Sequence, residues 1–300
     1  GTDALLTVVQ NLRRRILALG GEVRFGAQVT GFLREGGALS GVEVCERGET
    51  YTLPCRRAVL AIGHSARDTF ETLLQSGVPM EPKAFSMGVR IEHRQEMVNE
   101  SQYGAFADRL GAADYKLNVR FPDGTSAYTF CMCPGGHVVA AASEEGGVVT
   151  NGMSDFARDG ENANAALLVT LTPEDFPGKD VLGGMRWQRE IEQAAFRAGG
   201  ANYRAPAQLA GDFLAHRAST ALGTVRPTYR PGVTLCDLHD VLPERITSVL
   251  KQAIPALDRK LHGFASPDAV LTAPETRSSS PVRILRDETK QSTGLRGLYP

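Results

Sequence analysis

Two cysteines separated by one residue are the most chemically suggestive pair in the sequence. Cys131 and Cys133 lie in the run CMCPGG. On a β-strand, alternate residues point to the same face, so the two thiols are predicted to lie side by side, available for redox or thiolate chemistry near a cofactor. The alternative is that both are small buried side chains, because free cysteine is among the most buried residue types. No further ligand lies at a suitable spacing, so we expect both thiols to stay reduced and to bind no metal.

A second candidate group combines hydroxyl and guanidinium side chains near the end of the chain. It consists of Arg277, Ser278, Ser279, Ser280 and Arg283. Such groups suit an anion or the polar edge of a ring. The alternative is an ordinary solvated loop, because serine is common in turns.

The usual catalytic signatures are absent from this sequence. It contains no GxGxxG, GxxxxGK[ST], HExxH or GxSxG motif and no CxxC pair. The six histidines are dispersed, without the spacing of a metal site. We therefore expect each histidine to be a surface residue or a hydrogen-bonded core residue, and we predict no metal site.

The stretch from 56 to 74 changes its hydrophobic period in the middle. The apolar run Ala58 to Ile62 predicts a strand buried on both faces, and Gly63 ends it. Ser65 is the expected cap of a helix that follows. Such a unit places helix N–H groups at the edge of a sheet where nucleotide phosphates bind. The alternative is an ordinary strand-to-helix junction.

Hydrophobic periodicity predicts the elements on either side of this stretch. A helix capped by Thr2 or Asp3 is expected to run to Leu19, followed by a small antiparallel meander. Beyond a linker at 78–82, the period is mostly that of strands up to about residue 171 and that of helices from Met185. Expected strands are 22–25, 29–34, 39–46, 50–54, 85–92, 127–133, 137–142, 165–171 and 269–273. Expected helices are 185–198 and 206–213, with a short helix and loop over 97–110 and one or two helices within 238–261.

Composition and charge narrow the function classes. The 33 Lys and Arg residues nearly balance the 34 acids, so the net charge of −1 gives no electrostatic case for nucleic acid or an anionic membrane. No apolar run approaches the ~20 residues of a membrane span, and no signal-peptide pattern is present, so a cytoplasmic protein is expected. The five cysteines are odd in number and scattered, which favours reduced thiols over disulfides.

Several long phrases resemble one family. The segments GTDALLTVVQNLRRRI, AIGHSARDTFETLL, YTFCMCPGGHVVAAASEEGGVVTNGMS, FASPDAVL and ETRSSSPVRILRDE are similar to uncharacterised bacterial FAD-dependent dehydrogenases. These resemble glutathione-reductase-type flavoproteins. The resemblance implies an α/β fold with an α+β insertion. A partial FAD/NAD(P)-binding Rossmann-like domain would be interrupted by a substrate domain that consists of a mixed β-sheet plus helices.

This resemblance implies a division of the chain. Residues 1–79 would be the middle of the FAD-binding domain, 80–270 the inserted substrate domain and 271–300 the return toward the FAD-binding domain. Within the insertion, a β part is expected at about 85–172 and 264–273, and a helical part at about 185–262. The dinucleotide fingerprint and the glycine-rich flavin segment of the family are missing, so we interpret the chain as an internal piece. We expect it to fold, to lack FAD, to be inactive alone and to be prone to self-association.

The implied activity is that of a FAD-dependent oxidoreductase of unknown substrate. Hydride from a small-molecule substrate or from NAD(P)H would be transferred to flavin N5, with the protein supplying orientation and electrostatics. The competing hypothesis is a recognition module for a protein or RNA partner, with flavin structural or sensory, although the neutral charge weakens the RNA version. Cys131 and Cys133 carry no role implied by the resemblance. The cofactor contacts that it implies are the backbone of Val29 at the adenine end, Gly63 and His64 near the dinucleotide, and Ser279, Ser280, Pro281 and Arg283 at the isoalloxazine.

Overall fold

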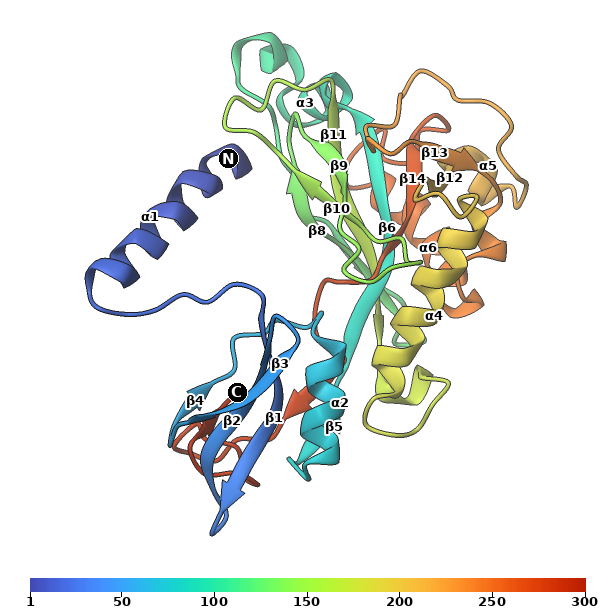
Figure 1. Cartoon of the computed structure of the whole chain (residues 1–300). Coiled ribbons are helices and arrows are strands. Elements are labelled where there is room, and N and C mark those ends of the chain that lie inside the picture. The colour runs from blue at the N-terminus through green and yellow to red at the C-terminus, as the bar shows by residue number, and fades with distance from the viewer. The chain divides into compact units, whose positions relative to one another are not determined.

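The computed structural model describes all residues, 1–300, which form two compact units (Figure 1). Each unit is assembled from segments that are far apart in the sequence. No helix is both long and apolar enough to cross a membrane. Unit 1 comprises Gly1–Leu6, Phe85–Asp175 and Trp187–Ser278, and unit 2 comprises Thr7–Ala84, Phe176–Arg186 and Ser279–Pro300.

The meander predicted in unit 2 is present as a three-stranded antiparallel sheet. Its strands are β1 (Ala27–Glu35), β2 (Ala38–Glu46) and β3 (Glu49–Pro54), in that order. The expected strand at 22–25 is wrong. There Arg24 bonds with Glu22, two residues away, and no neighbouring strand pairs with this exposed segment.

The strand, turn and helix expected at 56–74 are present in a reduced form. Strand β4 covers only Ala58–Val59 and pairs on one side, in parallel, with β16 (Leu298–Tyr299). Val59 is 77% exposed, so the prediction of a strand buried on both faces is wrong. Helix α2 (Arg67–Gln75) begins after Ala66 and has no side-chain cap, so the expected cap at Ser65 is also wrong. Two parallel strands do not make a Rossmann sheet, and that assignment stays a prediction.

The core of unit 2 joins its separate segments. Strand β5 (Met80–Pro82) pairs with β15 (Val282–Ile284), which connects the two sides of the long insertion. Helix α1 (Leu5–Ala18) follows a 3-10 turn over Thr2–Ala4, so the expected cap at Thr2 or Asp3 lies within this turn. No residue of α1 is buried. The buried apolar cluster consists of Leu39, Phe70, Leu73, Val78, Met80, Leu182, Met185, Val282, Leu295 and Leu298.

Unit 1 is built on a seven-stranded mixed sheet with the order β13-β12-β14-β6-β11-β8-β7. All its pairs are antiparallel except β12 with β13. The central strands β6 and β11 consist almost entirely of buried residues. The strands are β6 (Phe85–Arg94), β7 (Asn118–Arg120), β8 (Ser126–Cys133), β11 (Asn162–Leu171), β12 (Ala205–Leu209), β13 (Val233–Leu235) and β14 (Val270–Glu275).

Different elements cover the two faces of this sheet. Arg90 and His93 are three residues apart on β6 and therefore point to opposite faces. On the Arg90 side lies the two-stranded pair of β9 (His137–Ala140) and β10 (Thr150–Met153), since Arg90 bonds to Asn151 of β10. His93 bonds to the carbonyl of Phe264, beyond helix α6. The helices of unit 1 are α3 (Gln95–Tyr103), α4 (Gly183–Ala198, from Trp187 onward), α5 (Ala210–Leu214) and α6 (Glu244–Asp258), with 3-10 turns at Gly104–Arg109, Pro173–Asp175 and Leu238–Asp240.

The expected division into a β part and a helical part is wrong in one respect. Pro206 does not open a helix, because 205–209 forms β12 between β13 and β14 of the main sheet. Residues 185–262 therefore supply two strands to the sheet as well as the helices packed on it. The expected strands at 127–133 and 137–142 are present, but β8 pairs with β7 and β11 whereas β9 pairs with β10.

Candidate functional site

A small hollow in unit 2 brings together three of the predicted cofactor residues. Gly63, Ser280 and Arg283 line it, beside the apolar side chains of Leu60, Ile62 and Phe70. Its volume is about 230 Å³. Gly63 has φ +64° and a Cβ added there would meet no atom within 4 Å, so glycine is favoured for its backbone conformation and not for space.

The polar groups around this hollow already have protein partners. The Ser280 hydroxyl donates to the Val282 carbonyl at 2.8 Å and accepts from the Val282 amide at 3.2 Å. Arg283 pairs with Glu81 at 2.8 Å, and both side chains are exposed. The serine thus fixes the turn into β15, while the exposed arginine can exchange its partner at little cost.

The other predicted cofactor residues do not line the hollow. Val29 lies on β1 opposite Val44, where it is 39% exposed. His64 is half-buried in the link before α2. Ser279 and Pro281 flank Ser280 in the turn, and the Pro281 carbonyl accepts the amide of Lys83 at 2.8 Å. Whether these four residues contact a cofactor stays a prediction.

Cys131 and Cys133 line the same hollow, but they differ in burial. The pairing of β8 with β11 shifts between Cys133 and Phe130, so β8 carries an extra residue there. Cys131 has φ +42°, an uncommon value for a residue other than glycine, and is exposed, whereas Cys133 is buried. Cys133 donates its S–H to the Cys131 carbonyl at 3.2 Å. Burial raises the pKa of the Cys133 thiol. All five cysteines are free.

The buried guanidinium of Arg90 holds this bulge in place. Its Nη1 donates to the Cys131 carbonyl at 2.9 Å and to Asn164 at 3.0 Å. Its Nη2 donates to Asn151 at 3.0 Å, and Nε and Nη2 form a bidentate pair with Glu275 at 2.9 and 3.2 Å. Arg90 is fully buried and all five of its N–H groups are used. It therefore positions the unusual backbone of Cys131 and has no donor left for a ligand.

An open hollow adjoins the exposed cysteine within unit 1. Its volume is about 730 Å³, which is in the range of small-molecule sites. Both cysteines, Met153, Ser154 and Phe156 line it, together with the first residues of the chain. Its exposed lining is mainly apolar and also includes the charged side chains of Asp155 and Arg158, a combination that suits an organic ligand with a polar group.

A second buried carboxyl lies on the same face of the sheet. Glu92 accepts the Thr228 hydroxyl at 2.6 Å, the Thr228 amide at 3.1 Å and the Asn162 amide at 3.2 Å. No cationic side chain pairs with it. Burial raises the pKa of Glu92, and these hydrogen bonds oppose the shift only in part.

The predicted anion-binding group is divided by the structure. Arg277 forms a bidentate pair with Glu192 at 2.8 and 2.9 Å, and the same carboxylate accepts the Thr276 hydroxyl at 2.7 Å. Ser278 donates to the Ser86 carbonyl at 2.8 Å. The charge of Arg277 is thus matched by a buried carboxylate of the protein, and Arg277 lies in unit 1 while Arg283 lies in unit 2.

One cluster was missed from the sequence altogether. His216, Asp237 and His239 lie close together in unit 1. Asp237 and His239 are two residues apart, a local signal, but His216 comes from a different element and only the fold brings it near.

Comparisons with known proteins identify the family. The sequence profile described as "FAD-dependent protein, C-terminal domain-like" matches residues 84–278. A relative from Clostridium beijerinckii, itself described only as an uncharacterized protein, is 49% identical over 303 residues. The match covers 100% of this chain and 56% of the relative, so the chain spans about half the length of the curated relative it matches.

Two solved structures match this chain at a distance. A triple mutant of the flavin-dependent brominase Bmp2 matches with a TM-score of 0.30 and 12% identity, covering 55% of this chain and 32% of that chain. The anhydrotetracycline hydroxylase OxyS from Streptomyces rimosus matches with a TM-score of 0.25 and 16% identity, covering 63% and 28%. At this level of similarity, neither structure defines the fold or the chemistry of this chain.

Proposed function

This chain belongs to the family of FAD-dependent proteins that share this C-terminal domain, and from that premise we propose that the intact protein is a FAD-dependent oxidoreductase whose substrate binds to unit 1. The observation that carries the proposal is the family match over residues 84–278, which includes nearly all of unit 1. When bound, FAD would accept hydride at flavin N5 from a small-molecule substrate or from NAD(P)H.

The residues of unit 2 fit one end of such a cofactor. The hollow beside Gly63 has apolar walls for a flat ring and the exposed Arg283 for a polar edge or a phosphate. Its volume of about 230 Å³ is below the 300–1,000 Å³ typical of complete small-molecule sites. We infer that Gly63, Ser280 and Arg283 would hold one ring of FAD.

In unit 1, we assign Cys131 to the wall of the substrate site. Its exposed thiol faces the 730 Å³ hollow, and its left-handed backbone is held by Arg90. Strained backbone that is fixed by a buried network is often found at functional sites. Arg90 is a positioning residue, because all its donors are used within the protein. Cys131 would contact the substrate and exclude water from that side.

The proposal is tested on the intact protein. It should purify with bound FAD and oxidise NAD(P)H in the presence of an artificial electron acceptor. A maleimide on Cys131, the one exposed cysteine, should block the hollow and slow turnover without releasing flavin. The Cys131→Ser variant should stay active after maleimide treatment and is the matched control.

Two results would contradict the proposal. If the protein is colourless and cannot be loaded with FAD, the proposed flavin function is wrong. A co-purifying protein partner would then favour the hypothesis of a recognition module. If maleimide slows the wild type and Cys131→Ser equally, the substrate does not bind beside Cys131.

A further inference from the structure

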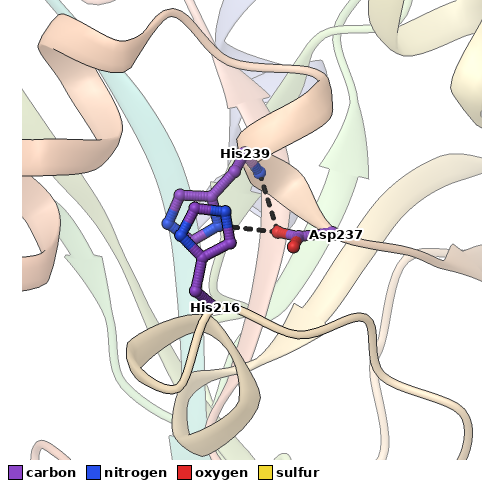
Figure 2. Close-up of side chains that lie close together, drawn as sticks. All are labelled: His216, Asp237 and His239. Atoms are coloured by element: carbon purple, nitrogen blue, oxygen red, sulfur yellow. Dashed lines mark hydrogen bonds and ion pairs between the residues drawn. The ribbon is translucent and has the colours of Figure 1, made fainter.

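His216, Asp237 and His239 form a side-chain cluster in unit 1, outside the residues assigned to the flavin reaction (Figure 2). One ligand-type atom from each residue lies within 4.8 Å of those of the other two. We propose that this cluster is a binding site for a divalent transition-metal ion, with Zn²⁺ as the ion that its donors suit best.

The donor set has the chemistry of a zinc site. Zinc binds imidazole nitrogen and carboxylate oxygen, and many sites use three protein ligands and a water. With bonds of about 2.0–2.1 Å at tetrahedral angles, the ligand atoms lie roughly 3.3 Å apart. The Nδ1 of His239 and Oδ1 of Asp237 are 2.6 Å apart, bridged by a hydrogen bond. An ion that replaces that proton would need these two atoms to separate only slightly.

His216 must turn to complete the coordination. Its ring is stacked on His239, with centroids 3.9 Å apart and planes 9° from parallel, as Figure 2 shows. An imidazole binds a metal in the plane of its ring, so two stacked rings cannot share an ion without a rotation. His216 is exposed and free to rotate, whereas His239 is packed on its other face against Phe213 at 4.6 Å. The half-buried His239 and Asp237 thus form the fixed half of the site.

The two segments that carry the ligands are fixed independently of any ion. Gln208 is fully buried and donates to the Arg217 carbonyl at 2.8 Å, while its oxygen accepts the Leu238 amide at 2.8 Å. The Asp212 carboxylate accepts from Arg217 and from Ser219, both at 2.7 Å. Such supporting hydrogen bonds reduce the ordering that metal binding must impose.

Backbone and carboxylate geometry agree with this assignment. His216 has φ +54°, a left-handed conformation that persists where its surroundings impose it, and its ring stacks on that of His239. The hydrogen bonds of Asp237, from Gln208 and from the amide and ring of His239, all go to Oδ1. An ion that replaces the ring proton of His239 would therefore bind Oδ1, which keeps its bonds from Gln208 and from the His239 amide.

The explanation to be excluded is an aromatic column. Phe213, His239 and His216 would stack in the same way if the cluster served only for packing. The two explanations differ at His216, because Phe at this position keeps a stacking ring but removes the nitrogen. Asn at this position tolerates the left-handed backbone and removes the ring.

The test is a zinc titration of the full chain after treatment with chelator and dialysis. Calorimetry should show one Zn²⁺ per chain, and zinc should raise the midpoint of thermal unfolding. His239→Ala, Asp237→Asn, His216→Phe and His216→Asn should each weaken zinc binding by roughly tenfold or more. The matched control is His262→Ala, which removes an exposed histidine elsewhere in unit 1 and should bind zinc as the wild type does.

Cobalt(II) provides an independent measurement. Because five free cysteines are available, zinc bound by thiolates has to be distinguished from zinc bound by this cluster. Co²⁺ at the proposed site should give visible bands without a thiolate charge-transfer band, and these bands should disappear in His216→Phe. Circular dichroism without metal checks that each variant is folded. Zinc binding that is absent, unchanged in His216→Phe and His216→Asn, or accompanied by the thiolate band would overturn the proposal.

Discussion

Replacing Glu92 by Gln should leave the protein as stable as the wild type, or more stable, at pH 7, although the side chain is fully buried. The three close hydrogen bonds to this carboxyl all go to Oε1, and Oε2 receives only the Thr228 amide at 3.4 Å. A Gln side chain can place its own oxygen at Oε1 and keep all three bonds. It also removes a buried charge that forms no ion pair and is attracted only by the nearby Arg90.

The pH dependence follows from the direction in which burial moves the pKa. Burial raises the pKa of Glu92 above its ordinary value of 4.5. The folded state therefore binds the proton of Glu92 more tightly than the unfolded state does, which stabilises the fold. This stabilisation is complete at a pH below the unfolded-state pKa and is lost as the pH rises through the folded-state pKa. A pKa that is higher by one in the folded than in the unfolded state corresponds to about 1.4 kcal/mol of this stabilisation. The Gln variant lacks this proton, so its stability relative to the wild type should increase as the pH rises above about 4.5.

Urea unfolding at several pH values measures this difference, with Glu92→Ala as the contrasting variant. Alanine leaves the amide and hydroxyl of Thr228 without acceptors, at roughly 1–3 kcal/mol each, so it should destabilise the protein by about 2–6 kcal/mol. A Gln variant that loses more than about 2 kcal/mol at pH 7, with no change in pH dependence, would refute the reasoning. It would show that the ionised carboxylate stabilises the fold.

Three further predictions concern the other sites. Arg90→Met should destabilise the protein by about 3–5 kcal/mol in chemical denaturation, because it leaves Glu275 buried without its partner, and a loss below about 1 kcal/mol would contradict this. Gly63→Ala should cost about 1–2 kcal/mol by thermal unfolding, entirely from its positive φ, so an unchanged midpoint would refute the conformational argument. A thiol reagent such as Ellman's should modify the exposed Cys131 well before the buried Cys133, whose pKa is raised, and equal rates measured on single-cysteine variants would contradict the burial described.

Elements with a strong local period could be predicted from the sequence. The central strand near 85–92 and the helix near 185–198 are present because their apolar spacing matches the faces they bury. Prediction failed where pairing with distant strands decides the conformation. Pro206 would favour the start of a helix, yet 205–209 pairs with β14. Val59 is exposed because its side chain lies on a face of the short strand that is left open.

The candidate sites were less predictable for the same reason. The two cysteines could be found from their spacing, but the bulge that separates their environments depends on Arg90 and on Glu275, which is 185 residues from Arg90 in sequence. Histidines 216 and 239 appeared dispersed because no periodicity links the turn after α5 to the turn after β13. Spacing along one element identifies possible chemistry, whereas contacts between elements determine which residues act together.

The position of β6 between β11 and β14 has a consequence for synthesis on the ribosome. β6 ends at residue 94, but β14 begins only at residue 270. At ~5–20 residues per second, roughly 9–35 s therefore pass before the second neighbour of this almost fully buried strand is synthesised. During that time the apolar edge of β6 is open to other chains or to chaperones. Arg90 also lacks its ion-pair partner during this time, because Glu275 belongs to β14. Burying its charge earlier would be strongly unfavourable, so the centre of unit 1 must close after translation has passed residue 275.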